Sequence, residues 1–265
     1  MEGAVETRLG KIGVLADGLG QRASERLPIL FLHGVGSDKS AWAPQIAHFS
    51  RTRAAIAADY PGYGDSAFTV AATRDDYADA MIALLDTLEI ERAHLCGLSL
   101  GGVIALAIAA AAPDRVASLV IANSFALHPD GRAIHDGSVA ACGEMGMAAM
   151  ADARIGRLLG SHPPQGLRAD AVRTMSAIRP EAYRLGARAV WLADMRTAAA
   201  DIKHPALVLC GSEDRVTPPA LSDDLAERLD HARRIDIEGA GHLSNLERPE
   251  SFNSAVDEFI SELDQ

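Results

Sequence analysis

Short apolar runs of strand length alternate with longer segments of helical periodicity over most of the chain. Strand candidates occupy residues 28–32, 53–58, 93–96, 116–122, 205–210 and 233–237. A run that is apolar on both faces is typical of an interior strand of a parallel sheet. Residues 5–16 instead alternate loosely and contain two glycines, which predicts an edge strand entering a hairpin through 17–20.

Helical patterns lie between these strand candidates. Over residues 73–88 the apolar side chains fall on one face of a helix, at Tyr77, Ala80, Met81, Leu84, Leu85 and Leu88. Further helices are predicted from Ser40 onward and over 100–112, 219–229 and 249–263. Strands that alternate with helices over short links predict an α/β fold, a mostly parallel central sheet with helices on both faces.

The alternation of predicted strands and helices is interrupted once. Residues 126–199 contain no good strand candidate; they are rich in Ala, Met and Arg and are broken by prolines at 163–164 and at 180. Strand and helix alternate again after residue 200. The sequence therefore predicts a core formed by 1–125 and 200–265, carrying an inserted helical cap, or lid, at 126–199.

Residues 94–102 form a strand, a sharp turn and the start of a helix, with Ser99 at the apex of a Gly-x-Ser-x-Gly turn. Glycines on either side of the serine remove Cβ atoms that would clash where strand and helix meet. Such a turn holds the hydroxyl at the carboxyl end of a sheet, beside the positive end of a helix. Ser99 is therefore a candidate nucleophile.

A serine nucleophile needs a base, and the base needs a third group to orient it. In a parallel sheet both partners come from loops at the same carboxyl edge. Downstream, the 211–219 loop offers Asp214, with Glu213 as its neighbouring rival, and the 238–242 loop offers His242. An acid could also follow the 116–122 strand, but that position is Asn123, which favours Asp214.

Five motifs stand in the order and at the spacings of the α/β-hydrolase fold superfamily. They are His33–Gly36, Asp59–Gly64, Gly97–Gly101, Gly211–Pro219 and Gly241–His242. Outside the insertion, the chain resembles that superfamily over nearly its whole length. The resemblance implies a catalytic triad of Ser99, Asp214 and His242, with the backbone N–H groups of Val35 and Leu100 as the oxyanion hole.

Residues 179–183, 211–219 and 241–249 are similar to the 3-oxoadipate enol-lactonases, whereas the 33–36 loop looks equally like esterases and meta-cleavage carbon–carbon hydrolases. The resemblance implies a serine hydrolase that cleaves an ester or lactone through an acyl-enzyme, acting on a small carboxylated substrate. A general carboxylesterase and a meta-cleavage-product carbon–carbon bond hydrolase are alternatives. A non-catalytic ligand-binding protein of this fold is a third.

Charge is distributed unevenly along the chain. The formal net charge is −11, but nine arginines and seven acidic residues give residues 126–199 a charge of +2 and leave −13 for the rest. A positive lid over a negative body suits an anionic substrate. Candidate substrate-binding residues are Arg132, Arg154 and Arg188 for a carboxylate, with Met147 and Trp191 as an apolar wall.

Composition argues against several other partners. The negative charge disfavours nucleic acid, and no apolar run approaches the ~18 residues of a membrane span. The N-terminus lacks the pattern of a secretory signal, so we expect a cytoplasmic protein without a membrane partner. The three cysteines are far apart, and no phosphate loop, dinucleotide fingerprint or His-x-x-x-His pair occurs, so we infer no cofactor and no metal. The oligomeric state stays open.

Overall fold

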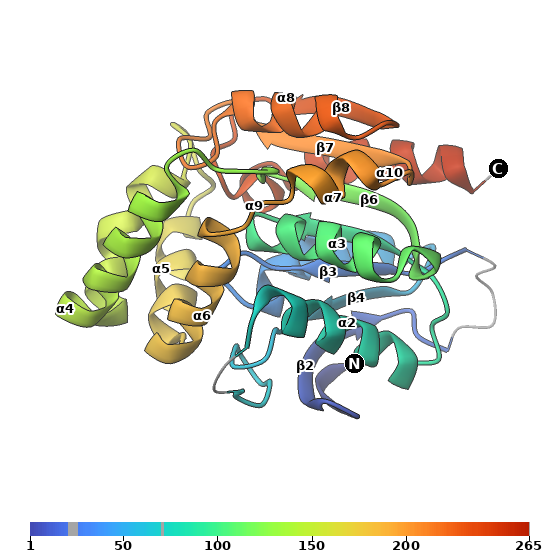
Figure 1. The fold of residues 1–265 in the computed structure, drawn as a ribbon, viewed down its shortest axis with the longest axis horizontal. Helices are drawn as coiled ribbons and strands as arrows, with labels where there is room; N and C mark the ends of the chain where they lie inside the picture. The colour runs from blue at the N-terminus through green and yellow to red at the C-terminus, as the bar shows by residue number, and fades with distance from the viewer. Residues whose placement is uncertain (21–25, 70–71, 265) are drawn as a thin grey trace.

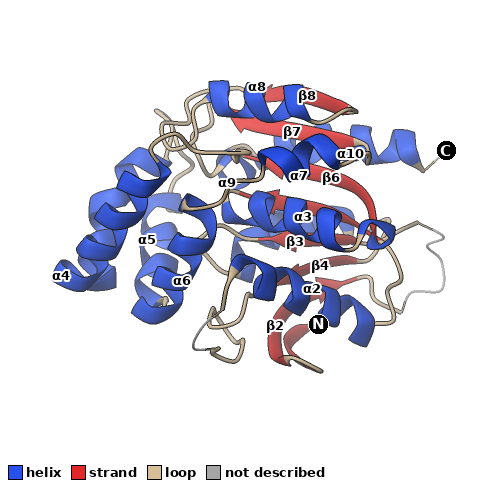
Figure 2. Cartoon of the chain, viewed as in Figure 1, coloured by secondary structure: helices blue, strands red, loops and turns tan. Residues whose placement is uncertain are grey.

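A computed structural model describes residues 1–20, 26–69 and 72–264, which are built around one eight-stranded sheet (Figures 1 and 2). Its strands are β1 (Glu2–Thr7), β2 (Gly10–Asp17), β3 (Ile29–Leu32), β4 (Ala55–Ala58), β5 (Ala93–Leu98), β6 (Val116–Ala122), β7 (Ala206–Gly211) and β8 (Ala232–Ile237). Their order is β1-β2-β4-β3-β5-β6-β7-β8. The pairs β1–β2 and β2–β4 are antiparallel and all others are parallel, so the predicted α/β fold is confirmed.

Helices connect and cover these strands. They are η1 (Lys39–Trp42), α1 (Ala43–Phe49), α2 (Arg74–Thr87), α3 (Leu100–Ala111), η2 (Pro113–Arg115), α4 (Gly131–Leu158), α5 (Leu167–Ala177), α6 (Pro180–Trp191), α7 (Arg196–Asp201), α8 (Pro219–Arg228), α9 (Ser244–Glu247) and α10 (Pro249–Leu263). Helix α2 begins at a capping box, in which Thr73 and Asp76 satisfy each other's backbone N–H groups. Within the described residues, no helix is both long and apolar enough to cross a bilayer.

Both faces of the sheet are buried, which explains the continuous apolar runs. In β3, Leu30 and Leu32 pack into the core shared with α2 and α3, on the face toward the viewer in Figure 1. The alternate residues, Ile29 and Phe31, join the opposite core with α1 and α10. A strand between two helical layers has no polar face, so its sequence carries no alternation.

Helices α4, α5 and α6 lie to one side of the sheet (left in Figure 1), and residues 126–199 contribute no strand to it. Helix α4 is interrupted at Gly146, which has φ 74° and ψ 170°. The two parts of α4 meet across this break, because Arg154 Nη1 donates to Ser138 Oγ at 2.7 Å.

The N-terminal prediction is wrong in detail. Residues 5–16 are not one edge strand: β1 and β2 form an antiparallel hairpin that turns between Thr7 and Gly10. Gly10 has φ 110°, and the Thr7 hydroxyl donates to the Gly10 carbonyl at 2.7 Å. Alternation continues through both strands, so periodicity alone did not reveal the reversal. Residues 17–20 are not the turn of a hairpin, because the second strand that pairs with β2 is β4 and not the next strand in the chain, β3.

A buried histidine in β5 makes the fold sensitive to acid. His94 is 2% exposed, its Nδ1 lies 2.8 Å from Ser118 Oγ, and its Nε2 has no hydrogen-bond partner among the described residues. Burial, helped by the nearby Arg53 charge, lowers the pKa of His94 to about 4. Below the ordinary histidine pKa of 6.5, the imidazole of His94 is protonated in the unfolded chain. In the folded chain it stays neutral down to about pH 4.

We expect the unfolding free energy to fall as the pH drops from about 6.5 to 4, with His94 accounting for about 3 kcal/mol of that loss. His94→Asn keeps a polar atom near Ser118 and removes the titration, so its stability should decline less over this range. Urea unfolding at pH 7 and pH 4.5 measures the difference. Parallel declines in the two proteins would contradict the assignment.

Candidate active site

Ser99 occupies a strained turn between β5 and α3. It has φ 55° and ψ −111°, a region that side-chain-bearing residues avoid. A Cβ at Gly97 would lie 2.1 Å from the Gly101 carbonyl oxygen, and one at Gly101 would lie 2.0 Å from that of Leu32. The backbones of β5, α3 and β3 therefore touch here, and the Gly-x-Ser-x-Gly pattern is a steric requirement of that contact.

Asp214 and His242, predicted from separate loops, lie together at the carboxyl ends of β7 and β8. His242 Nδ1 is 2.8 Å from Asp214 Oδ2, and both residues are buried. The neighbouring Glu213 instead accepts hydrogen bonds from Ser161 N and Oγ, both at 2.6 Å. The geometry thus pairs Asp214, and not Glu213, with the histidine.

The Asp214 carboxylate is surrounded by donors. Its Oδ1 accepts from the backbone N–H groups of Val216 and Thr217, at 2.7 and 3.0 Å. Its Oδ2 accepts from the Thr217 hydroxyl at 2.7 Å and from Asn123 Nδ2 at 2.8 Å, besides facing His242. Burial alone would raise the pKa of Asp214, but His242 and these hydrogen bonds outweigh it and lower the pKa to about 2. The group is a carboxylate at every physiological pH.

Asn123 is a residue of this site that the sequence predictions passed over. It follows β6 with φ 49° and is fully buried. Its Nδ2 also donates to the Gly241 carbonyl at 3.2 Å, and Ser244 Oγ donates to its Oδ1. Asn123 thereby connects the acid loop with the histidine loop. The signal for it in the sequence is its place at the end of a central strand, a position predicted above only as a possible site for a carboxylate.

Val35 and Leu100 present their N–H groups in the two segments beside Ser99. Among the described residues neither N–H has a hydrogen-bond acceptor, and Leu100 N is the first of helix α3. The buried His33 fixes the Val35 loop: its Nδ1 donates to the Gly34 carbonyl at 2.8 Å. Burial lowers the pKa of His33, which keeps the ring neutral.

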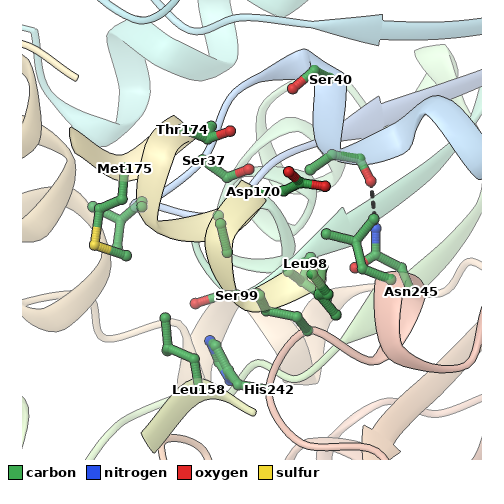
Figure 3. Close-up of a pocket in the computed structure, with 18 of the residues that line it drawn as sticks. Ser37, Ser40, Leu98, Ser99, Leu158, Asp170, Thr174, Met175, His242 and Asn245 are labelled. Atoms are coloured by element: carbon green, nitrogen blue, oxygen red, sulfur yellow. Dashed lines mark hydrogen bonds between the residues drawn. The ribbon is translucent and has the colours of Figure 1, made fainter. Parts of the chain in front are cut away.

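Ser99 and His242 point into one cavity of about 300 Å³ (Figure 3). No hydrogen bond joins these two described side chains; such contacts are often long without substrate and shorten in the complex. The wall is mainly apolar and includes Leu98, Leu158, Leu167, Met175, Val216, Leu243 and Leu246. Asp170 and Arg173 lie on α5 as an exposed ion pair that also lines the cavity.

Of the five substrate-binding candidates in the helical segment, Arg154 and Trp191 line this cavity. Arg132, Met147 and Arg188 do not. Arg132 and Arg188 are exposed on the solvent faces of their helices, where a charge keeps its hydration. Met147 is buried between helices, with its sulfur 3.6 Å from Cys142 Sγ.

Arg154 has only neutral partners. Its Nη1 donates to Ser138 Oγ and to the Tyr183 hydroxyl, both at 2.7 Å, and no described carboxylate lies within ion-pair distance. The buried Trp191 Nε1 also has no acceptor among the described residues. The cavity wall thus holds one guanidinium without a carboxylate partner, Arg154, and one N–H donor without an acceptor, Trp191 Nε1. No group of three or more His, Cys, Asp or Glu side chains suited to a metal occurs in the described ranges.

Comparison with known proteins relates the chain to enzymes of several substrate classes, among them a putative carbamate hydrolase of Caulobacter sp. that is 32% identical over 91% of this chain and 93% of that one. Residues 29–255 match the model of the alpha/beta hydrolase family. The chain is 28% identical to 3-oxoadipate enol-lactonase 1 of Acinetobacter baylyi, over 89% of each chain. It is 27% identical to (E)-2-((N-methylformamido)methylene)succinate hydrolase of the same organism, over 88% of this chain and 90% of that one. The crystal structure of the enol-lactonase from Burkholderia xenovorans LB400 superposes with a TM-score of 0.88 at 29% identity, covering 97% and 99% of the two chains.

The strain at Ser99 is measurable without any substrate. Ser99→Gly removes the Cβ that disfavours this conformation, whereas Ser99→Ala keeps it, so the glycine variant should be the more stable by about 1 kcal/mol. Thermal and urea unfolding of the two variants provide the comparison. An alanine variant at least as stable as the glycine variant would show that the turn stores no strain.

Proposed function

The chain belongs to the alpha/beta hydrolase family, and on this basis we propose that it is a serine hydrolase that cleaves a small carboxylated ester or lactone, as an enol-lactonase does. One observation carries the proposal. Ser99 stands at a strained apex in the same cavity as His242, whose imidazole is held by the buried Asp214 carboxylate. This arrangement supplies a nucleophile, a base and an orienting acid.

In the proposed reaction His242 Nε2 removes the proton of Ser99 Oγ as the oxygen attacks the substrate carbonyl. Asp214 Oδ2 accepts a hydrogen bond from His242 Nδ1–H, which sets the imidazole tautomer and stabilises the cation that forms. Collapse of the tetrahedral intermediate expels the leaving oxygen, which takes up the proton held by His242, and leaves an acyl-enzyme. The neutral His242 then removes a proton from a water molecule that attacks the acyl group, and returning that proton to Ser99 releases the acid and restores the serine. With an enol-lactone, the protonated leaving oxygen is an enol, which tautomerises to a ketone.

The negative oxygen of the tetrahedral intermediate needs fixed donors. We assign this role to the N–H groups of Val35 and Leu100, which lack acceptors of their own among the described residues. Leu100 N also stands at the positive end of α3. The neutral His33 holds the Val35 loop in place and takes no proton in this scheme.

Residues 126–199 act as a lid in this proposal. They supply Arg154, Leu158, Leu167, Met175 and Trp191 to the cavity wall, opposite the loops of the 1–125 and 200–265 core. An apolar enclosure excludes water, which strengthens each electrostatic contact at the reacting carbonyl. Arg154, without a carboxylate partner, would bind the carboxylate of the substrate, and the two relatives compared above are named for adipate and succinate derivatives.

Replacing the nucleophile tests the chemistry. Ser99→Ala should fold and lose at least ~10⁴-fold in kcat on esters and lactones, because the remaining groups cannot form an acyl-enzyme. Ser40→Ala is the matched control: its hydroxyl is exposed beside the same cavity and bonds Asp38, so kcat should stay within about threefold. Retained hydrolysis in the Ser99 variant would refute the mechanism.

A substrate panel tests the acyl group. It compares a carboxylated enol-lactone, its methyl ester, p-nitrophenyl esters and a meta-cleavage product. We expect the carboxylated lactone to have the highest kcat/KM. Fastest turnover of the meta-cleavage product would instead identify a carbon–carbon hydrolase. No turnover anywhere, together with ligand binding, would indicate a non-catalytic protein.

Arg154→Met keeps the length of the side chain and removes its charge. It should lower kcat/KM for the carboxylated lactone by about 10- to 100-fold, the value of a hydrogen bond to a charged group, and change the methyl ester less than about threefold. The two substrates are compared on one variant because the substitution also leaves the buried Tyr183 hydroxyl without its partner. Arg168→Met, which breaks only an exposed ion pair with Asp152 and lies outside the cavity wall, serves as control. Equal losses on both substrates would exclude a carboxylate contact.

A further inference from the structure

The segment in which α4 ends is hydrogen-bonded to the loop that carries Asp214 and to the loop that carries His242. We call residues 158–162 the exit segment. The Leu158 carbonyl, one of the last four of α4, accepts from the backbone N–H of His242 at 2.7 Å, and Figure 3 shows the two residues side by side. Ser161 donates to Glu213, next to Asp214 in sequence, and the His162 carbonyl accepts from Arg248 at 3.2 Å.

Glu247 lies between the exit segment and the histidine loop. Its Oε1 accepts from Gly241 N at 2.9 Å, and its Oε2 accepts from Gly160 N at 2.7 Å. The residue is only 2% exposed, and burial raises its pKa against the opposing effect of these N–H groups. The Glu247 carboxylate therefore connects Gly241, the residue before His242, to Gly160, which lies two residues after the end of α4.

Glycines bring several backbones into direct contact in this region. A Cβ at Gly241 would lie 2.5 Å from Gly160 N, and one at Gly211 would lie 2.0 Å from the Gly241 carbonyl oxygen. The backbones of β7, the histidine loop and the exit segment thus lie directly against one another. Gly239 has a φ of 67°, a conformation that disfavours a side chain. Hydrogen bonds must supply the precision that side chains cannot.

We infer that Glu247 is a positioning residue for His242, holding the histidine backbone against the end of α4 through the N–H groups of Gly241 and Gly160. His242 is then fixed at three points: its Nδ1 on Asp214, its own N–H on Leu158, and the preceding N–H on Glu247. This inference rests on the proposed function, because it assigns the effect to the base of the reaction.

The same contact relates substrate binding to the base. Arg154 and Leu158 are four residues apart on α4, so they share one face of the helix, and both line the cavity. A substrate whose carboxylate binds Arg154 would therefore be positioned relative to His242 by a single turn of helix and by the hydrogen bonds at the end of that helix. Loosening Glu247 should disturb the approach of base to nucleophile more than substrate binding.

Glu247→Gln tests this role. The amide has one acceptor oxygen for two N–H donors and turns its NH₂ toward the other, so one contact is lost. We expect kcat to fall about 10- to 100-fold with KM changed less than about threefold, since sub-ångström misplacement of a base costs rate. The Nδ1–H resonance of His242 in downfield proton NMR should broaden or shift. A variant that is only less stable would keep kcat and the resonance at temperatures well below its Tm.

Two further variants complete the experiment. Glu213→Gln loosens the same exit segment at Ser161 without touching Gly241, and kcat should stay within about threefold. Gly160→Ala keeps Glu247 but adds a Cβ 3.0 Å from Gly241 N, which pushes the two backbones apart and should lower kcat as Glu247→Gln does. If Glu247→Gln does not fold, Gly160→Ala decides alone.

A fluorophosphonate probe separates the two hypotheses. Labelling of Ser99 needs the activated serine but no particular substrate. If the wild-type protein is neither labelled nor active on the panel, the proposed function fails. If the wild type is labelled and Glu247→Gln reacts at the same rate with unchanged kcat, the function stands and the positioning role is wrong. Slower labelling with retained fold supports it.

Discussion

The close contact between helix α3 and strands β3 and β5 is the constraint on which the rest of the site depends. Gly97 and Gly101 allow three backbones to meet at distances that no Cβ would permit. That contact forces Ser99 into its strained conformation and directs Leu100 N outward at the start of α3. It also brings the end of β3, and hence Gly34, close to the serine: a Cβ at Gly34 would lie 3.6 Å from Ser99 Cβ. Nucleophile and candidate oxyanion donors are thus products of one packing event.

A buried negative charge governs the other half of the site. Moving a carboxylate out of water is costly, and Asp214 recovers that cost through donors from its own loop, from Asn123 and from His242. Since each donor has a fixed direction, the carboxylate and the imidazole it faces are fixed as well. The pKa of about 2 records how strongly the surroundings favour the charged form. The hydrogen bonds that stabilise the charge of Asp214 are therefore also the ones that fix the positions of the carboxylate and the imidazole.

Much of the fold could be predicted because its signals are local. Strand β6 and helix α10 were expected with the bounds they have, since prolines or an uninterrupted apolar run mark their ends. The pairing of Asp214 with His242 followed from a topological rule that brings the ends of parallel strands to one edge. The hairpin of β1 and β2 was missed because reversal leaves the alternation intact.

The contacts made by the helical segment could not be predicted in the same way. Which arginine lines the cavity depends on the rotation of each helix, and in α4 the break at Gly146 resets that rotation. Arg154 and Arg132 are therefore equally good candidates by residue type, but Arg154 lines the cavity and Arg132 is exposed to solvent. Asn123 and Glu247 were passed over for another reason. Asn123 bonds groups that are 91 to 121 residues away, and Glu247 bonds the N–H of Gly160, 87 residues away; such long-range bonds leave no periodic trace in the sequence.

The contact between Asn123 and Asp214 also limits how this site can evolve. The two side chains come from neighbouring strands and meet at 2.8 Å, so aspartate at both positions would place two carboxylates in hydrogen-bond contact, and one would have to take up a proton. The site accommodates a single negative charge, and the amide at 123 is the complement of the acid at 214. Moving the acid from one strand to the other with the same charge and the same hydrogen bond requires exchanging both residues. Asparagine at 123 therefore records which of two strands holds the charge.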